Sequence, residues 1–193
     1  MECAGMVDVK TYECFPTLIH EVKMDIETYD KINMKMYVQR NYITDGSIND
    51  DLHTMSYFKP LSLKVLAYSE KILRHSGYEF DKLEITNMWG NLLNKDGDHS
   101  PHTHSNNILS GVYYVDVRET QGDLYVDNPN TVDYDWNRDV TIFEDISDNS
   151  IATNNWSFVP KEGDLYLFPS WAKHGVTPNT TKNNRISISF NLS

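Results

Sequence analysis

The sequence is poor in cysteine and has no long apolar run. Its 193 residues include only two cysteines, Cys3 and Cys14, and they form no CxxC pair. A disulfide framework is therefore not expected, and a reducing compartment is the simpler interpretation. No apolar stretch approaches the roughly 18 residues of a membrane span, and residues 1–10 lack the basic and apolar regions of a secretory signal. We therefore expect a cytoplasmic protein that does not cross a membrane.

Basic residues are also scarce. The chain has 17 Lys and Arg residues against 28 Asp and Glu residues, which gives a net charge of −11. Such a surface repels a phosphate backbone, so this balance argues against a nucleic-acid partner. Internal repeats, low-complexity tracts and linkers are missing as well. With 39% hydrophobic and 23% charged residues, the whole chain, 1–193, is predicted to form a single domain.

The pattern of apolar residues changes along the chain. Ile26 to Arg40 and Pro60 to His75 have helical spacing, and Pro60 suits a first turn. After Gly77, short strand-like runs alternate with turn residues at intervals near ten. The clearest are LEITNMWGNLL, ILSGVYYVDV, GDLYVDN, WSFVPKEGDLYLF and RISISFNL. This spacing predicts a mainly β fold, a two-sheet jelly roll with helices packed on one sheet. Residues 1–80 would be the helical N-terminal part that supports the sheet, and 81–193 the jelly-roll core.

The last run, RISISFNLS, alternates most regularly. Ile186, Ile188, Phe190 and Leu192 share one face, and Arg185, Ser187, Ser189 and Asn191 share the other. The polar face could meet either solvent or a cavity. The polar stretch Asn130 to Ser150 is a long insertion between strands, and we expect it to be a substrate-shaping loop.

Three of the seven histidines lie within six positions, in HSPHTH. If a strand begins at His102, the rings of His102 and His104 project from one side, about 6–7 Å apart along the strand. His99 lies beyond Ser100–Pro101 and is expected to be off that face, in solvent. Imidazole is a ligand for zinc, iron, copper and nickel. A solvated histidine loop is the alternative.

A third ligand would have to come from elsewhere, and His174 is the candidate. A hairpin that turns near Asn179–Thr180 would bring His174 and Arg185 together on neighbouring strands. An arginine facing a cavity favours an anion, because its fork matches a carboxylate with two hydrogen bonds.

At this point the chain resembles a known family. HTH before a strand with SGVYYV, then GDLYLFPSW, a distal histidine and RIS resemble the iron(II)- and 2-oxoglutarate-dependent oxygenases. More narrowly, they resemble the prolyl-4-hydroxylase-like subgroup found in marine bacteria and their phages. The resemblance covers roughly Leu83 to Ser193, and FPTLIHEV, from Phe15, is also similar to the opening of that subgroup.

The resemblance implies a role for each matching residue. His102 and His174 would be iron ligands, and His104 would stand where most of the superfamily has a carboxylate. Arg185 would bind the distal carboxylate of 2-oxoglutarate, with Ser187 and Tyr114 assisting and Asn91 as a polar neighbour. Tyr113 points the other way and is expected in the core. Asp98 is a second candidate carboxylate, at a less favourable spacing from His102.

The family resemblance implies a hydroxylase that uses iron(II) and 2-oxoglutarate, releases succinate and carbon dioxide, and has ascorbate as reductant. Its substrate would be a small molecule or a peptide, such as a prolyl or other amino-acid residue, in the cytoplasm of a bacterium or a phage-infected cell. Two alternatives remain. One is a three-histidine dioxygenase of the cupin kind, which needs neither 2-oxoglutarate nor Arg185. The other is a non-catalytic metal-binding jelly-roll module.

Overall fold

The protein is described by a computed structural model that covers residues 16–41, 50–130 and 153–193. Its strands are β1 (His20–Lys23), β2 (Ile85–Leu93), β3 (His99–His102), β4 (Leu109–Asp116), β5 (Leu124–Asp127), β6 (Asn155–Phe158), β7 (Asp164–Pro169), β8 (His174–Val176) and β9 (Arg185–Leu192). They form two antiparallel sheets, with the orders β1-β7-β4-β9-β2 and β3-β8-β5-β6. The predicted mainly β architecture of two sheets is confirmed, and the N-terminal part contributes an edge strand as well as helices.

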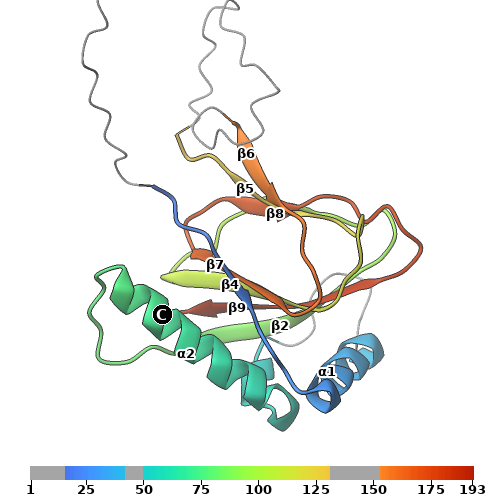
Figure 1. The fold of residues 1–193 in the computed structure, drawn as a ribbon, viewed down its shortest axis with the longest axis horizontal. Helices are drawn as coiled ribbons and strands as arrows, with labels where there is room; N and C mark the ends of the chain where they lie inside the picture. The colour runs from blue at the N-terminus through green and yellow to red at the C-terminus, as the bar shows by residue number, and fades with distance from the viewer. Residues whose placement is uncertain (1–15, 42–49, 131–152) are drawn as a thin grey trace, which may run out of the picture.

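Both α-helices lie on the outer side of the five-stranded sheet (Figure 1). They are α1 (Thr28–Asn41) and α2 (Lys59–His75), close to the two predicted helices, and two short 3-10 helices precede α2 at Leu52–Thr54 and Ser56–Phe58. Pro60 lies in the first turn of α2, where a missing N–H costs no helical hydrogen bond. Gly77 follows the helix with a φ of 88°, a conformation that glycine adopts without strain. Among the described residues, no helix combines the length and apolar character needed to cross a bilayer.

The two faces of β9 separate the hydrophobic core from a polar interior. Ile186, Ile188 and Phe190 are fully buried in the cluster shared with the helices. On the opposite face, Arg185 and Ser187 are only 2% and 1% exposed, between the two sheets. The polar face of this strand therefore meets a cavity, which settles the alternative that the sequence left open.

The prediction for the histidine strand is wrong in its boundary. Strand β3 ends at His102 instead of beginning there, so His104 follows the strand. Pro101 is tolerated inside β3 because the strand is at the edge of its sheet, and the pairing with β8 shifts register between His99 and His102.

The predicted hairpin between His174 and Arg185 is also wrong. Strand β8 pairs with β3 and β5, whereas β9 pairs with β4 and β2 in the other sheet. The connection between them is too long for a tight turn. The buried Asn179 side chain holds it by donating to the Leu93 and Asn183 carbonyls, at 2.9 and 2.8 Å. The chain thus crosses from one sheet to the other.

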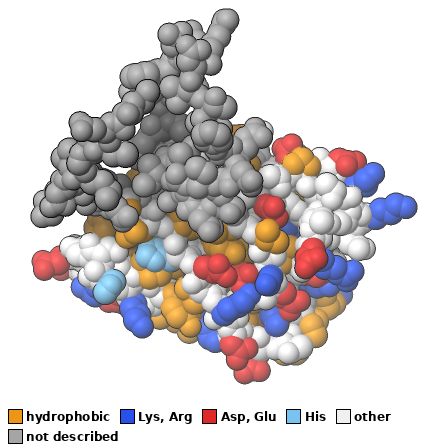
Figure 2. Space-filling view, turned by 45° about the horizontal axis from the view of Figure 1, so that its top comes forward, with side chains coloured by type: hydrophobic (Ala, Val, Ile, Leu, Met, Phe, Trp, Pro, Cys, Tyr) orange, Lys and Arg blue, Asp and Glu red, His pale blue; other side chains and the backbone are white. Residues whose placement is uncertain are grey.

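On the face drawn in Figure 2, acidic, basic and apolar side chains are interspersed, and the described residues form no continuous basic patch there. Except for Asn130, the predicted substrate-shaping insertion lies outside the described residues, as do Cys3, Cys14 and Phe15.

Candidate metal and co-substrate site

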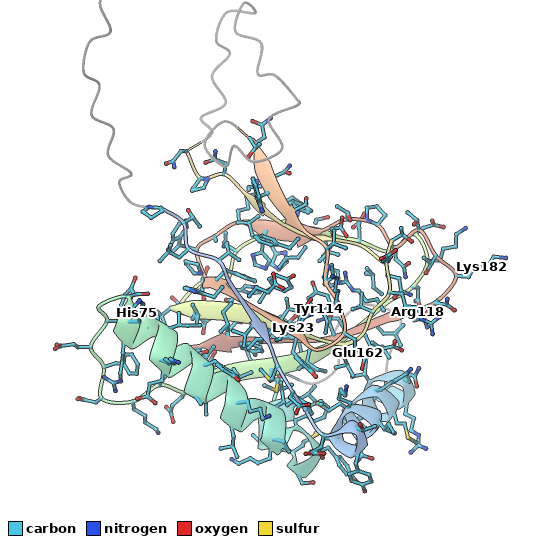
Figure 3. All side chains as sticks on the ribbon, viewed as in Figure 1. Lys23, His75, Tyr114, Arg118, Glu162 and Lys182 are labelled. Carbon is cyan, nitrogen blue, oxygen red and sulfur yellow. The ribbon has the colours of Figure 1, made fainter. Side chains whose placement is uncertain are left out.

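A cavity of about 290 Å³ lies between the two sheets. Its polar lining comes from both sheets and the loop after β3: Asn91, His99, His102, His104, Tyr114, His174, Arg185, Ser187 and Ser189. Apolar side chains and one glycine complete it: Trp89, Gly111, Val112, Leu124, Phe168 and Val176. Figure 3 shows side chains of both sheets extending into the space between them, where Tyr114 of β4 is labelled. The predicted polar residues therefore share one interior.

His102, His104 and His174 form a compact cluster in the lining of this cavity. One ligand nitrogen from each ring lies within 4.8 Å of the others. The ring centroids of His102 are 5.0 Å from His104 and 4.5 Å from His174, and the latter two are 5.1 Å apart. Three imidazoles at this separation can bind one transition-metal ion and leave further coordination positions open. Asp98 does not belong to the cluster.

Backbone carbonyls fix the tautomers of two of these histidines. His102 Nδ1 is 2.8 Å from the Ser100 carbonyl, and His174 Nδ1 is 2.9 Å from the Ala172 carbonyl. Because a carbonyl only accepts, both bonds require the proton on Nδ1. The unprotonated Nε2 of each ring is then free to bind a metal, which is the usual arrangement for histidine ligands.

Burial also favours the neutral form of two of these histidines, His104 and His174. Burial, together with the neighbouring His102, lowers the pKa of His104 from 6.5 to about 4. Burial likewise lowers the pKa of His174 to about 4, against the opposing effect of the Ala172 carbonyl. Neutral imidazole is the form that binds metal, so both rings are ready to do so at neutral pH.

These pKa shifts predict how the stability of the metal-free protein depends on pH. Between pH 6.5 and about 4, His104 and His174 stay neutral in the folded state but are protonated in the unfolded state. The unfolded state then binds more protons, so the free energy of unfolding decreases as the pH falls through this window. Urea denaturation in the presence of a chelator should show it, with a weaker dependence in the His104→Gln/His174→Gln double variant. If the free energy of unfolding has the same pH dependence in the native protein and the double variant, the pKa values of His104 and His174 are not lowered in the folded state.

Arg185 lies in the same cavity as a buried cation. Its Nη1 donates to the Gly122 carbonyl at 2.9 Å, while its Nε is buried without a partner. Gly122 has a φ of +95°, and a Cβ there would lie 2.4 Å from the Thr177 carbonyl oxygen, so the position requires glycine. No carboxylate of the described residues forms an ion pair with Arg185. A buried guanidinium without a counterion is costly, which favours an anionic ligand at this place.

Tyr114 provides a second unused donor beside Arg185. The guanidinium carbon lies 5.5 Å from the Tyr114 ring centroid, and the buried Tyr114 hydroxyl has no hydrogen-bond partner among the described residues. Burial raises the pKa of Tyr114 to about 12 although Arg185 opposes the shift, so the hydroxyl remains protonated and can donate. Ser187 lines the cavity on the same strand as Arg185. Tyr113, as predicted, belongs to the helix-side core.

Asn91 and His99 take less direct positions. The Asn91 side-chain amide donates to Ser189 Oγ at 2.9 Å, so it faces the cavity but is engaged with β9. His99 is half-buried and lines the cavity, so the expectation that it lies in solvent is wrong. Its position opposite Val176 on β8 nevertheless leaves it outside the three-histidine cluster.

Comparison with known proteins then places the chain in a family. The model of the 2OG-Fe(II) oxygenase family matches residues 87–191, which include the three clustered histidines and Arg185. The chain belongs to the 2OG-Fe(II) oxygenase family. No curated protein sequence matched this oxygenase.

Solved structures share the fold of this oxygenase at low sequence identity. The 2-oxoglutarate-dependent epimerase SnoN from nogalamycin biosynthesis has a TM-score of 0.63 at 13% identity, over 91% of this chain and 78% of SnoN. HygX from Streptomyces hygroscopicus, with nickel and 2-oxoglutarate bound, has a TM-score of 0.63 at 11% identity, over 92% and 82%. A Pseudomonas putida prolyl-4-hydroxylase has a TM-score of 0.61 at 11% identity, over 91% and 92%. These neighbours confirm the jelly-roll fold.

The sequence reasoning missed Trp89 as a residue of the site. The Trp89 ring lies 5.7 Å from the His104 ring, and both line the cavity. A signal was present, because Trp89 and Asn91 are two positions apart on β2 and therefore share a face. The hydrogen bond from Arg185 Nη1 to the Gly122 carbonyl could not be predicted from the sequence. It joins a side chain to a backbone group 63 residues away, and such a contact leaves no local sequence pattern.

Proposed function

We propose that the protein is an iron(II)- and 2-oxoglutarate-dependent dioxygenase that hydroxylates its substrate, with His102, His104 and His174 as the metal ligands. The observation that carries this proposal is the pairing of two sites in one cavity. A three-histidine cluster, suited to a metal ion, shares the space with a buried Arg185 whose Nε has no hydrogen-bond partner among the described residues. A metal ion and a dicarboxylate are the two groups that such a cavity accommodates.

The residues fit 2-oxoglutarate in charge and hydrogen bonding. The unpartnered Arg185 Nε and Tyr114 hydroxyl would donate to its distal carboxylate, with Ser187 beside them. An iron(II) ion held by three neutral imidazole ligands would carry a charge of +2, which the dianionic co-substrate would balance. The bound iron(II) and 2-oxoglutarate would supply the chemistry, namely activation of dioxygen coupled to oxidative decarboxylation of the keto acid to succinate and carbon dioxide.

The protein itself contributes orientation and exclusion of water. Carbonyl contacts to Nδ1 of His102 and His174 leave Nε2 of each ring available to hold a metal ion, and burial keeps His104 and His174 unprotonated. Leu124, Phe168 and Val176 form an apolar wall of the cavity, which limits the entry of water and strengthens electrostatic interactions inside. These features hold reactants in place, which is the main catalytic contribution of a protein that uses a metal and a co-substrate.

The cupin-type alternative is less well supported. A dioxygenase without 2-oxoglutarate has no use for a buried Arg185 whose Nε lacks a partner. A non-catalytic metal module likewise leaves that guanidinium and the Tyr114 hydroxyl unexplained. A prolyl or other amino-acid residue is the proposed substrate class, consistent with the fold shared with the Pseudomonas putida prolyl-4-hydroxylase.

The test is co-substrate turnover without the prime substrate. We expect the purified protein to release succinate from 2-oxoglutarate in the presence of iron(II), ascorbate and dioxygen. Decarboxylation of the keto acid can proceed without oxidation of a prime substrate, because it needs only the metal, the keto acid and dioxygen. An Arg185→Met variant that still binds metal is the control and should release none. If both proteins fail while binding one metal each, the cupin-type alternative gains support.

A further inference from the structure

The three clustered histidines are held in place in different ways. The rings of His102 and His174 are fixed through Nδ1 by the carbonyls of Ser100 and Ala172. The ring nitrogens of His104 have no hydrogen bond to any described residue, and its ring contacts the Trp89 ring at 5.7 Å. Its backbone N–H, however, donates to the Ser170 carbonyl at 2.9 Å. The placement of His104 thus depends on Ser170, which lies between β7 and β8.

Ser170 is tied to the same loop by a second backbone bond. Its N–H donates to the Ile108 carbonyl at 3.2 Å, so one residue bonds both ends of the segment from His104 to Ile108. The turn that carries it is closed by the Ala172 N–H donating to the Pro169 carbonyl at 2.9 Å. Any displacement of Ser170 therefore carries the backbone of His104 with it.

The side chain of Ser170 connects it to the centre of the five-stranded sheet. Its hydroxyl lies 2.7 Å from Ser110 Oγ, and Ser110 Oγ donates to Asn191 Oδ1 at 2.6 Å. Ser110 has a single hydroxyl proton and gives it to Asn191, so Ser170 must be the donor to Ser110. All three residues are at most 2% exposed, and Ser110 and Asn191 are register partners on β4 and β9. Bulk solvent does not reach these bonds.

We propose that Ser170, Ser110 and Asn191 form a positioning network for the metal site, which sets the place of His104. The buried side chains of Asn191 on β9, Ser110 on β4 and Ser170 form a hydrogen-bonded chain. The Ser170 carbonyl then connects this chain to His104, the histidine of the cluster whose ring has no hydrogen bond to a described residue. None of the three network residues lines the cavity, and Ser170 reaches His104 only through a backbone hydrogen bond, so the network acts on the backbone of His104 and supplies no ligand. This inference rests on the proposed three-histidine ligand set.

The expected effect is on metal affinity, measured without turnover. Cobalt(II) titrations by calorimetry and visible absorption should show that Ser170→Ala binds the ion about tenfold more weakly, the lower end of the range for a lost supporting contact. Ser62→Ala is the matched control, because Ser62 is 3% exposed and its hydroxyl donates to the Phe58 carbonyl at 2.9 Å, far from the cluster. Its cobalt affinity should not change. Ser110→Ala provides a second network variant if Ser170→Ala folds poorly.

A double-mutant cycle with His104→Ala separates positioning from general loosening. If the network acts through His104, Ser170→Ala should have little further effect on cobalt affinity once His104 is gone, and its own cobalt spectrum should resemble that of His104→Ala. An equal loss of affinity in both backgrounds would overturn the positioning role while leaving the ligand set intact. Unchanged affinity in His104→Ala alone would instead refute the ligand set on which the inference rests.

Discussion

Replacing His174 by alanine is expected to abolish stoichiometric binding of iron(II) while the fold persists. His174 is the cluster member on β8, the strand that pairs with β3. Its Nδ1 contacts the Ala172 carbonyl, which leaves Nε2 available for a metal ion. Its removal leaves two imidazoles from one short segment, and affinity should fall by more than the roughly 10- to 100-fold that a lost supporting contact costs. Anaerobic iron(II) titration, with circular dichroism to verify folding, measures the effect. His102→Ala should behave in the same way.

His99→Ala is the matched control for this experiment. His99 is a half-buried histidine that lines the same cavity but lies outside the cluster. Its removal should leave iron affinity within about tenfold, the scale of an outer contact at most. A His174→Ala protein that binds one iron with unchanged affinity, or a His99→Ala protein that loses it, would refute the proposed ligands.

Arg185→Lys is expected to weaken 2-oxoglutarate binding by about ten- to a hundredfold, which corresponds to the ~1.5–3 kcal/mol of a charge-assisted hydrogen bond. The lysine retains the positive charge but has no planar fork for a carboxylate. It also loses the geometry with which Arg185 Nη1 binds the Gly122 carbonyl. The measurement is titration of 2-oxoglutarate into the iron(II) protein without oxygen, followed by absorption.

The iron(II) affinity of the Arg185→Lys variant shows whether the substitution affects only the binding of 2-oxoglutarate. Arg185 lies outside the histidine cluster, so the lysine variant should retain the iron affinity of the native protein. Tyr114→Phe should lower 2-oxoglutarate affinity as well, because the hydroxyl that it removes has no other partner. Equal 2-oxoglutarate affinity in the native and Arg185→Lys proteins would favour an oxygenase that does not use this co-substrate.

Local patterns predicted most of the secondary structure. Alternation in RISISFNLS indicated a strand with one apolar and one polar face, and the helical spacing from Pro60 to His75 indicated α2. These predictions succeeded because strand and helix periodicity are imposed by backbone geometry, which acts over a few residues. The three histidines proposed as ligands and Arg185 were singled out for a related reason, since the order of short motifs along the chain resembled a family.

The arrangement of these elements in space was not predictable in the same way. The two-residue spacing of His102 and His104 predicted that both lie on one strand. In the structure β3 ends at His102, and His104 lies in the loop that follows, where its backbone N–H donates to the Ser170 carbonyl. The predicted hairpin joined His174 to Arg185 in one sheet, whereas the chain crosses between sheets and places them on opposite walls of the cavity.

The sequence by itself determined which faces are apolar, which residue types can bind a metal ion or a carboxylate, and the family to which their order belongs. Only the tertiary structure decided that the polar face of β9 borders a cavity and not solvent, and that Arg185 forms no ion pair with a carboxylate of the described residues. Whether a polar face meets water or a closed interior depends on what the other sheet covers. That contact joins residues far apart in the chain, as Ser170, Ser110 and Asn191 are, and no local periodicity records it.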